Sequence, residues 1–83
     1  MSSIAEIREV LAQIQQHLGE AYRLAGVARE RVAESVAALT ELGRTHPDPL
    51  VPPELARADE QLGDGLARIA ETSAVLDRYT TLL

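Results

Sequence analysis

Apolar side chains recur every seven residues along the first half of the chain. With Ile4 as position a of a heptad labelled a to g, position a reads Ile4, Leu11, Leu18, Ala25, Val32, Leu39 and position d reads Ile7, Ile14, Ala21, Ala28, Ser35, Leu42. All of these are apolar or small, and Ser35 alone is polar. A repeat kept over almost six heptads is typical of a helix in a coiled coil or bundle. The pattern predicts a helix over about residues 3–42.

Both ends of this helix carry their own signals. Ser3 and Glu6 form a capping box, in which each side chain bonds the other's free backbone N–H. Gly43 follows the last heptad position, and glycine ends many helices by taking the left-handed conformation. At 1.5 Å per residue, such a helix is a rod about 60 Å long.

A proline-rich segment then interrupts the helical pattern. Residues 43–52 contain Pro47, Pro49 and Pro52, and Pro53 follows directly. Proline lacks the backbone N–H that an α-helix needs and clashes with the preceding turn, so this segment cannot continue the helix. In the first turn of a new helix the missing N–H costs nothing. The sequence therefore predicts a loop over about 43–52.

A second helix is predicted over about residues 53–82. Its position a reads Leu55, Leu62, Ile69, Leu76, Leu83, and its weaker position d reads Ala58, Gly65, Thr72. A short connection makes consecutive helices antiparallel neighbours. Since the second helix is about ten residues shorter, we expect the first to be left partly uncovered near residues 3–11.

The fold expected from these elements is all-α, a single helical-hairpin domain over residues 1–83. A two-helix hairpin has no interior layer, yet ordering about 80 residues costs on the order of 120 kcal/mol. We therefore expect it to complete a four-helix bundle or coiled-coil assembly, as a homo-oligomer or with another helical protein. The residues expected in the core are Ile7, Leu11, Ile14, Leu18, Ala25, Val32, Leu39, Leu62, Ile69 and Leu76.

Small residues form a second stripe at position b of both helices. In the first helix the stripe reads Ala5, Ala12, Gly19, Gly26, Ala33, and in the second Ala56, Gly63, Ala70. Small side chains let helix axes approach closely, so the stripe favours a second packing face. Alanine-rich helices also produce such stripes by chance.

Composition and charge narrow the classes of function. The 83 residues include no Cys, Trp or Phe, and thirteen Asp and Glu against eight Arg give a net charge of −5. Without Cys there is no thiolate zinc site and no cysteine nucleophile. The acidic balance disfavours nucleic acid and membrane surfaces as partners. The N-terminus lacks the features of a signal peptide, so we expect a cytoplasmic location, with secretion independent of a signal peptide left open.

Few residues are candidates for chemistry. His17 has no second ligand one helical turn away, and the acidic pairs Glu30 with Glu34 and Glu60 with Asp64 lie on outward-facing positions. Exposed like charges usually form a solvated face, and no nucleophile or phosphate-binding loop accompanies them. We expect no catalytic, cofactor or metal site.

The loop carries the tripeptide His46-Pro47-Asp48 between two antiparallel helices. This resembles the signature of J-domain co-chaperones, and it implies a regulator that stimulates a chaperone ATPase through His46 and Asp48. The surrounding residues depart from that family, because Thr45 replaces its aromatic residue and Pro49 its lysine. Turn formation is the simpler interpretation of the tripeptide, with Asp48 capping the turn.

The chain as a whole resembles small actinobacterial helical hairpins related to the Trp-X-Gly family of type VII secretion substrates and partners. The resemblance rests on the start Met1–Ile7, the Tyr-containing end Leu76–Leu83, and the acidic, alanine-rich composition. It implies a non-catalytic hairpin that pairs with other hairpins, associated with type VII secretion or a toxin system. The Trp of the family's turn motif is absent, and Leu83 stands where its secretion signal has an acidic residue after Tyr79.

Overall fold

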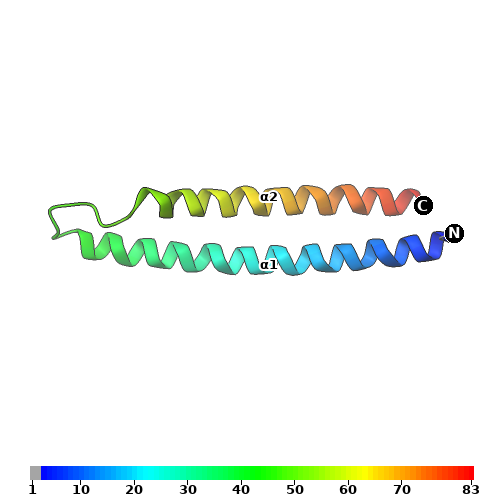
Figure 1. The fold of residues 1–83 in the computed structure, drawn as a ribbon, viewed down its shortest axis with the longest axis horizontal. Helices are drawn as coiled ribbons and strands as arrows, with labels where there is room; N and C mark the ends of the chain where they lie inside the picture. The colour runs from blue at the N-terminus through cyan, green and yellow to red at the C-terminus, as the bar shows by residue number, and fades with distance from the viewer. Residues whose placement is uncertain (1–2) are drawn as a thin grey trace.

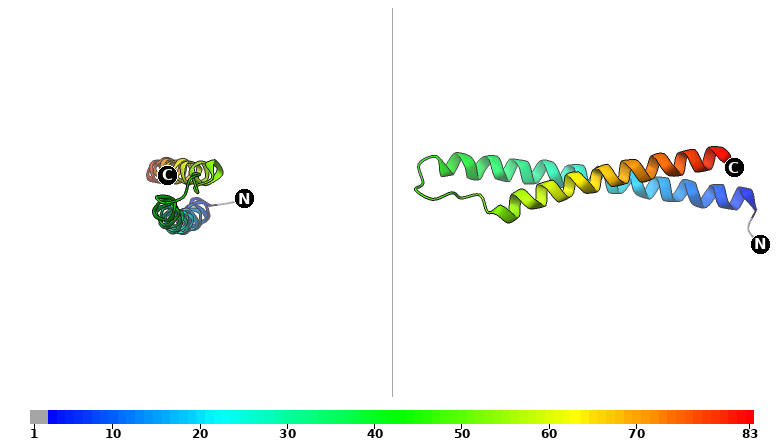
Figure 2. Two further views of the ribbon diagram at one scale, coloured as in Figure 1. Left: turned by 90° about the vertical axis from the view of Figure 1, so that its left-hand side faces the viewer. Right: turned by 90° about the horizontal axis from the view of Figure 1, so that it is seen from above.

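The protein, described by a computed structural model over residues 3–83, consists of two helices, α1 (Ile4–Gly43) and α2 (Pro53–Leu82). The helices run antiparallel side by side, with the loop at one end and both termini at the other (Figure 1). The hairpin measures 66 × 18 × 14 Å and its helices cross at a shallow angle (Figure 2). The predicted all-α helical hairpin is confirmed. Met1 and Ser2, part of the N-terminal resemblance, lie outside the described residues.

Helix α1 begins at the predicted cap. Ser3 is extended, with φ −79° and ψ 164°, and its hydroxyl accepts a hydrogen bond of 3.1 Å from the backbone N–H of Glu6. This bond satisfies one of the N–H groups that the first turn leaves without an intrahelical partner. Proline at the start of α2 performs a related role, because Pro53 has no N–H to satisfy.

Helix α1 ends at Gly43, but not in the way that the sequence suggested. None of the glycines in residues 3–83 has a positive φ, and Arg44 stays right-handed with φ −59° and ψ −34°. The prediction of a left-handed glycine is therefore wrong. Instead, a Cβ built on Gly43 would lie 3.7 Å from Cγ of Leu50, so the glycine makes room for the returning loop rather than reversing the chain.

Two polar pairs define the register of the helices. Gln15 donates through Nε2 to the Ser73 carbonyl at 2.8 Å and accepts from the Ser73 hydroxyl at 2.7 Å. Further along, Arg29 Nε lies 3.1 Å from Oδ1 of Asp59. In both pairs the two residue numbers add to 88. A residue of α1 therefore lies level with the α2 residue whose number is 88 minus its own.

This register places the uncovered end of α1 at the loop, not at the N-terminus. Pro53 lies level with Ser35, so the last turns of α1 extend past the start of α2 and end beside the loop, while Leu82 lies level with Glu6 (Figure 1). The expectation of an overhang near residues 3–11 is wrong. The nine-residue connection 44–52 cannot be helical, so it runs back beside α1, where Leu50 contacts Gly43.

The seam between the helices uses heptad positions a and e more than a and d. We take Leu55 as position a of α2. The side chains at position e of this helix are then turned toward α1 and are half-buried: Asp59, Leu66, Ser73 and Thr80. In α1, Gln15 and Val36 at position e are half-buried, whereas Ile14 at position d is 38% exposed. At position d of α2, Ala58, Gly65 and Thr72 are small and Tyr79 stays exposed, so this rotation buries the larger Leu66 at position e instead.

The prediction that Ile14 lies in the core is therefore wrong for the hairpin itself. The other predicted core residues do face the seam: Leu11 is buried, and Ile7, Leu18, Ala25, Val32, Leu39, Leu62, Ile69 and Leu76 are half-buried. Among residues 3–83, Leu11 is the single buried side chain, at 8% exposure. Two helices exclude water from a line of contact but do not enclose a core.

Candidate interaction surface

The grooves beside the seam show which heptad positions share a flank of the hairpin. One open groove, of about 500 Å³, is lined by Gly19 from α1 and Ala70 from α2, and a second by Ala33 and Ala56. All four residues occupy position b. Because b and d lie on opposite sides of the a/e seam in a helix of 3.6 residues per turn, positions d and g of both helices share the other flank.

Large apolar side chains gather on that second flank. Of the ten large hydrophobic residues exposed in the described part of the chain, seven occupy positions d and g. We call these seven residues the apolar flank: Val10, Ile14, Leu24, Leu42, Val75, Tyr79 and Leu82. Their exposed fractions run from 38% for Ile14 to 85% for Leu82. Single exposed apolar residues are common on proteins, but all of these except Leu42 gather in the half of the hairpin near the termini, and such a cluster marks an interaction surface.

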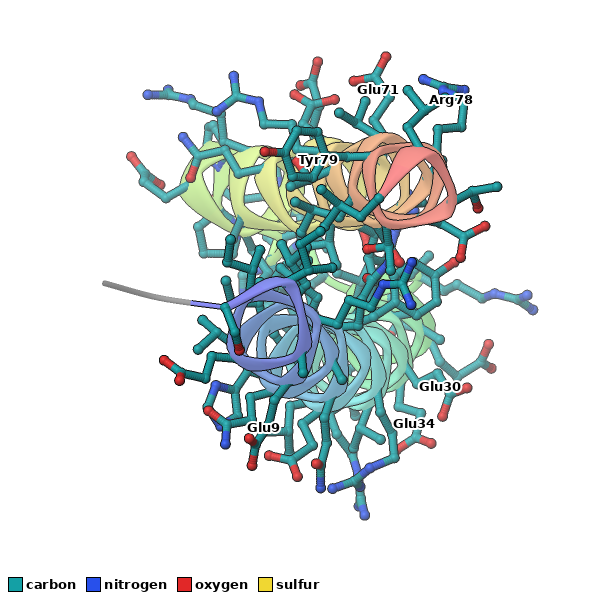
Figure 3. The ribbon with its side chains drawn as sticks, turned by 90° about the vertical axis from the view of Figure 1, so that its right-hand side faces the viewer. Glu9, Glu30, Glu34, Glu71, Arg78 and Tyr79 are labelled. Atoms are coloured by element: carbon teal, nitrogen blue, oxygen red, sulfur yellow. The ribbon has the colours of Figure 1, made fainter. Side chains whose placement is uncertain are left out.

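The remaining outward surface is charged. Figure 3 looks along the helices from the end where the termini lie, and shows Glu30 and Glu34 pointing from α1 away from α2. Glu71 and Arg78 point from α2 away from α1, whereas Tyr79 lies to the side of the pair (Figure 3). The acidic pairs therefore form a solvated face, and Tyr79, 53% exposed, belongs to the flank between that face and the seam.

The small-residue flank carries the polar pairs. A Cβ built on Gly63 would lie 2.8 Å from Nη1 of Arg29, so the guanidinium rests directly over this glycine on its way to Asp59. Arg29 and Asp59 are 46% and 38% exposed, which limits the strength of their ion pair. The stripes at position b thus line open grooves of the single hairpin, and in residues 3–83 no further helix fills them.

The loop candidates His46 and Asp48 are brought together, but through the backbone. Nδ1 of His46 lies 3.2 Å from the Asp48 N–H and 3.0 Å from the Asp48 carbonyl oxygen. When His46 Nδ1 is unprotonated, it accepts a hydrogen bond from the Asp48 N–H. When Nδ1 carries a proton, it donates to the Asp48 carbonyl oxygen. Both residues are exposed, and His46 N–H donates to the Gly43 carbonyl at 3.1 Å. The His46 imidazole thus makes the side-chain hydrogen bond that stabilises the turn, a role that the sequence predicted for the Asp48 carboxylate.

His17 and the acidic side chains are the remaining sequence candidates for chemistry. His17 is exposed at position g of α1. Across residues 3–83, no three His, Asp or Glu side chains gather closely enough to bind a metal ion. Neither α1 nor α2 has a stretch long and apolar enough to cross a bilayer.

Sequence reasoning missed two features of this surface. The pair Gln15 and Ser73 was not anticipated, although both residues occupy position e, opposite each other once the register is known. The membership of Val75, Tyr79 and Leu82 in one flank with Val10 and Ile14 was also missed. A signal for it existed, because position d of the second helix is small where position e carries Leu66.

Comparison with models of protein families, with curated proteins and with solved structures finds no match for this chain.

Proposed function

We propose that the chain is a non-catalytic interaction module whose apolar flank is covered by helices of another protein chain. The observation that carries the proposal is that, among residues 3–83, Leu11 alone is buried, while seven large apolar residues are exposed on one flank. A helix normally buries its apolar face against a partner element, and the hairpin leaves one such face open.

The exposed area supports the same proposal. The hairpin exposes 6499 Å². A chain of 9.0 kDa exposes about 13,000 Å² when unfolded, so folding buries only about half of that area, whereas even a 60-residue compact domain buries about 60%. Additional burial against another chain supplies the missing stabilisation, and folding and association are then coupled.

The resemblance to hairpins of the Trp-X-Gly family favours pairing with a helical protein, and an association with type VII secretion stays a prediction from that resemblance. The proposal itself rests on the flank and assigns no pathway.

Thiol labelling tests whether the flank is covered, because the chain has no Cys of its own. Val75→Cys places a thiol on the apolar flank, and Ala70→Cys places one on the opposite flank of the same helix, where Ala70 lines the groove with Gly19. Maleimide labelling is measured in extracts of cells that make the protein, and each rate is divided by the rate in denaturant. We expect labelling at position 75 to be at least about tenfold slower than at position 70.

The hairpin alone cannot produce such protection. Val75 is 52% exposed in the hairpin, so its own neighbours account for about a twofold reduction in access. Equal normalised rates at both positions, in the extract and in the purified protein, would contradict the interaction module.

A further inference from the structure

We infer that the occupant of the apolar flank is the same flank of a second copy of this chain, giving a closed two-fold pair of hairpins. The inference rests on the proposed function and deepens it by naming the partner. Its arguments are the amount of area that needs covering, the placement of the apolar residues on one side only, and the charge pattern around them.

The area that needs covering matches a homodimer interface. A compact protein of 9.0 kDa exposes about 4,900 Å², so the hairpin with its 6499 Å² exposes about 1,600 Å² more than a compact fold. Two chains that each cover this excess bury about 3,200 Å² in total, inside the range of about 2,000–5,000 Å² found for obligate homodimers. One further hairpin is thus enough, and a larger partner is not required.

The one-sided placement of apolar residues favours a closed pair over a growing chain. Positions d and g hold seven of the ten large exposed apolar residues, and the opposite flank holds Tyr22 and a stripe of Ala and Gly. Pairing of like flanks by a two-fold axis covers the apolar flanks of both copies at once. If the apolar flank of one copy instead packed against the opposite flank of the next, the last copy would always have an uncovered apolar flank. Such an assembly would keep adding copies and would not close.

The flank also lacks the charge that would exclude a second copy. Over the terminal half of the hairpin, the polar residues at d and g are His17 of α1 and Arg68 and Thr72 of α2, and no acidic residue occupies these positions. The acids that make up the net charge of −5 lie elsewhere, such as Glu30, Glu34 and Glu71 on the outward faces (Figure 3). Acidic side chains thus border the flank, as Glu71 does beside Val75 and Glu6 beside Val10, without occupying its d and g positions, so like-charge repulsion acts at the rim of the paired surface and not across its centre.

Sedimentation equilibrium of the full chain tests the inference with two substitutions on opposite flanks of α2. Val75→Glu places a carboxylate on the apolar flank, while Ala70→Glu places one on the other flank, where Ala70 lines the groove with Gly19. We expect the unsubstituted protein to have twice the mass of 9.0 kDa at micromolar concentration. Val75→Glu should weaken the pair at least about 100-fold, because it buries an unpaired charge, and Ala70→Glu by less than about threefold.

Circular dichroism on the same samples separates loss of pairing from loss of folding. Should Val75→Glu unfold altogether, Val75→Ala provides the second measurement, with an expected loss of about tenfold in the association constant for the deleted methyl groups. A mass that grows beyond two copies with concentration would overturn the closed pair. Stronger disruption by Ala70→Glu than by Val75→Glu would overturn the assignment of the flank.

A mass of one chain for the unsubstituted protein would overturn the inference, and the helicity then decides the fate of the proposed function. An isolated chain that is poorly helical, together with thiol protection in extracts, would point to a different partner and leave the interaction module standing. A fully helical, cooperatively unfolding single chain without thiol protection would overturn both.

Discussion

The paired hydrogen bonds between Gln15 and Ser73 predict a specific pattern of coupling between the two side chains. Gln15 makes both bonds, at 2.8 and 2.7 Å, but only one of them involves the Ser73 side chain, since the other ends on the Ser73 carbonyl. A hydrogen bond contributes about 1 kcal/mol net. Gln15→Ala should therefore lower the free energy of unfolding by about 2 kcal/mol, and Ser73→Ala by about 1 kcal/mol.

The double variant should cost no more than Gln15→Ala alone. Once Gln15 is truncated both bonds are gone, so removing the Ser73 hydroxyl as well takes nothing further away. The expected coupling free energy is about 1 kcal/mol, which is above the additivity error of about 0.3–0.5 kcal/mol for independent sites. Urea unfolding followed by circular dichroism measures all four proteins, at one protein concentration because association would shift the midpoints.

Two exposed residues supply matched controls for the change to alanine. Gln16→Ala and Ser35→Ala alter α1 at positions outside the seam, and each should change the unfolding free energy by less than about 0.5 kcal/mol. Strictly additive single substitutions would refute the reasoning, since the hydroxyl-to-amide bond would then contribute nothing. So would a cost for Ser73→Ala equal to that of Gln15→Ala, because the carbonyl bond should survive the first change.

Two further substitutions test local features of the helices. Gly65→Ala, with nothing within 4 Å of the added Cβ, should stabilise the protein by about 1 kcal/mol, whereas Gly63→Ala should gain only about half of this because it displaces the Arg29 guanidinium from Asp59. Urea unfolding at low and high salt checks this, and a difference that persists unchanged in 1 M salt would argue against the ion pair as its cause. Ser3→Ala should cost about 1 kcal/mol and speed hydrogen exchange at the Glu6 amide, while Ser3→Asp should retain most of the protection. Equal exchange rates at Glu6 in all three proteins would show that the cap does not hold the first turn.

Local features of the chain could be predicted because they depend on neighbouring residues alone. The heptad repeat, the Ser3 cap and the prolines each act within one or two helical turns, so the sequence determined two helices, their ends and the loop between them. The apolar content at positions a, d and g likewise indicated more hydrophobic surface than one partner helix can cover. This reasoning also located Leu11 in the seam, where it is the buried residue.

Rotation and register could not be predicted, because each is a property of the pair of helices. A one-residue change in rotation turns every side chain by 100°. In α1 the sequence favours a seam of positions a and d, because position e mixes Tyr22 and Val36 with polar residues such as Gln15 and Arg29. Two features of the packed pair select the a/e seam. Gln15 forms hydrogen bonds with Ser73, and α2 buries Leu66 at position e in preference to the smaller residues at position d. That choice leaves Ile14 outside and joins it with Val75 on one flank.

The path of the loop determines which end of α1 extends beyond α2. Sequence length alone showed that α2 is ten residues shorter than α1, but the end at which α1 is left over depends on the path of residues 44–52. The prolines force these residues to run back beside α1, so the shortfall appears at the loop and the two termini finish level. The sequence by itself thus determined which elements form and how apolar they are. The tertiary structure decided which side of each helix packs against the other. Several rotations of a helix about its axis have similar local energies, and only the contacts between the two helices distinguish them.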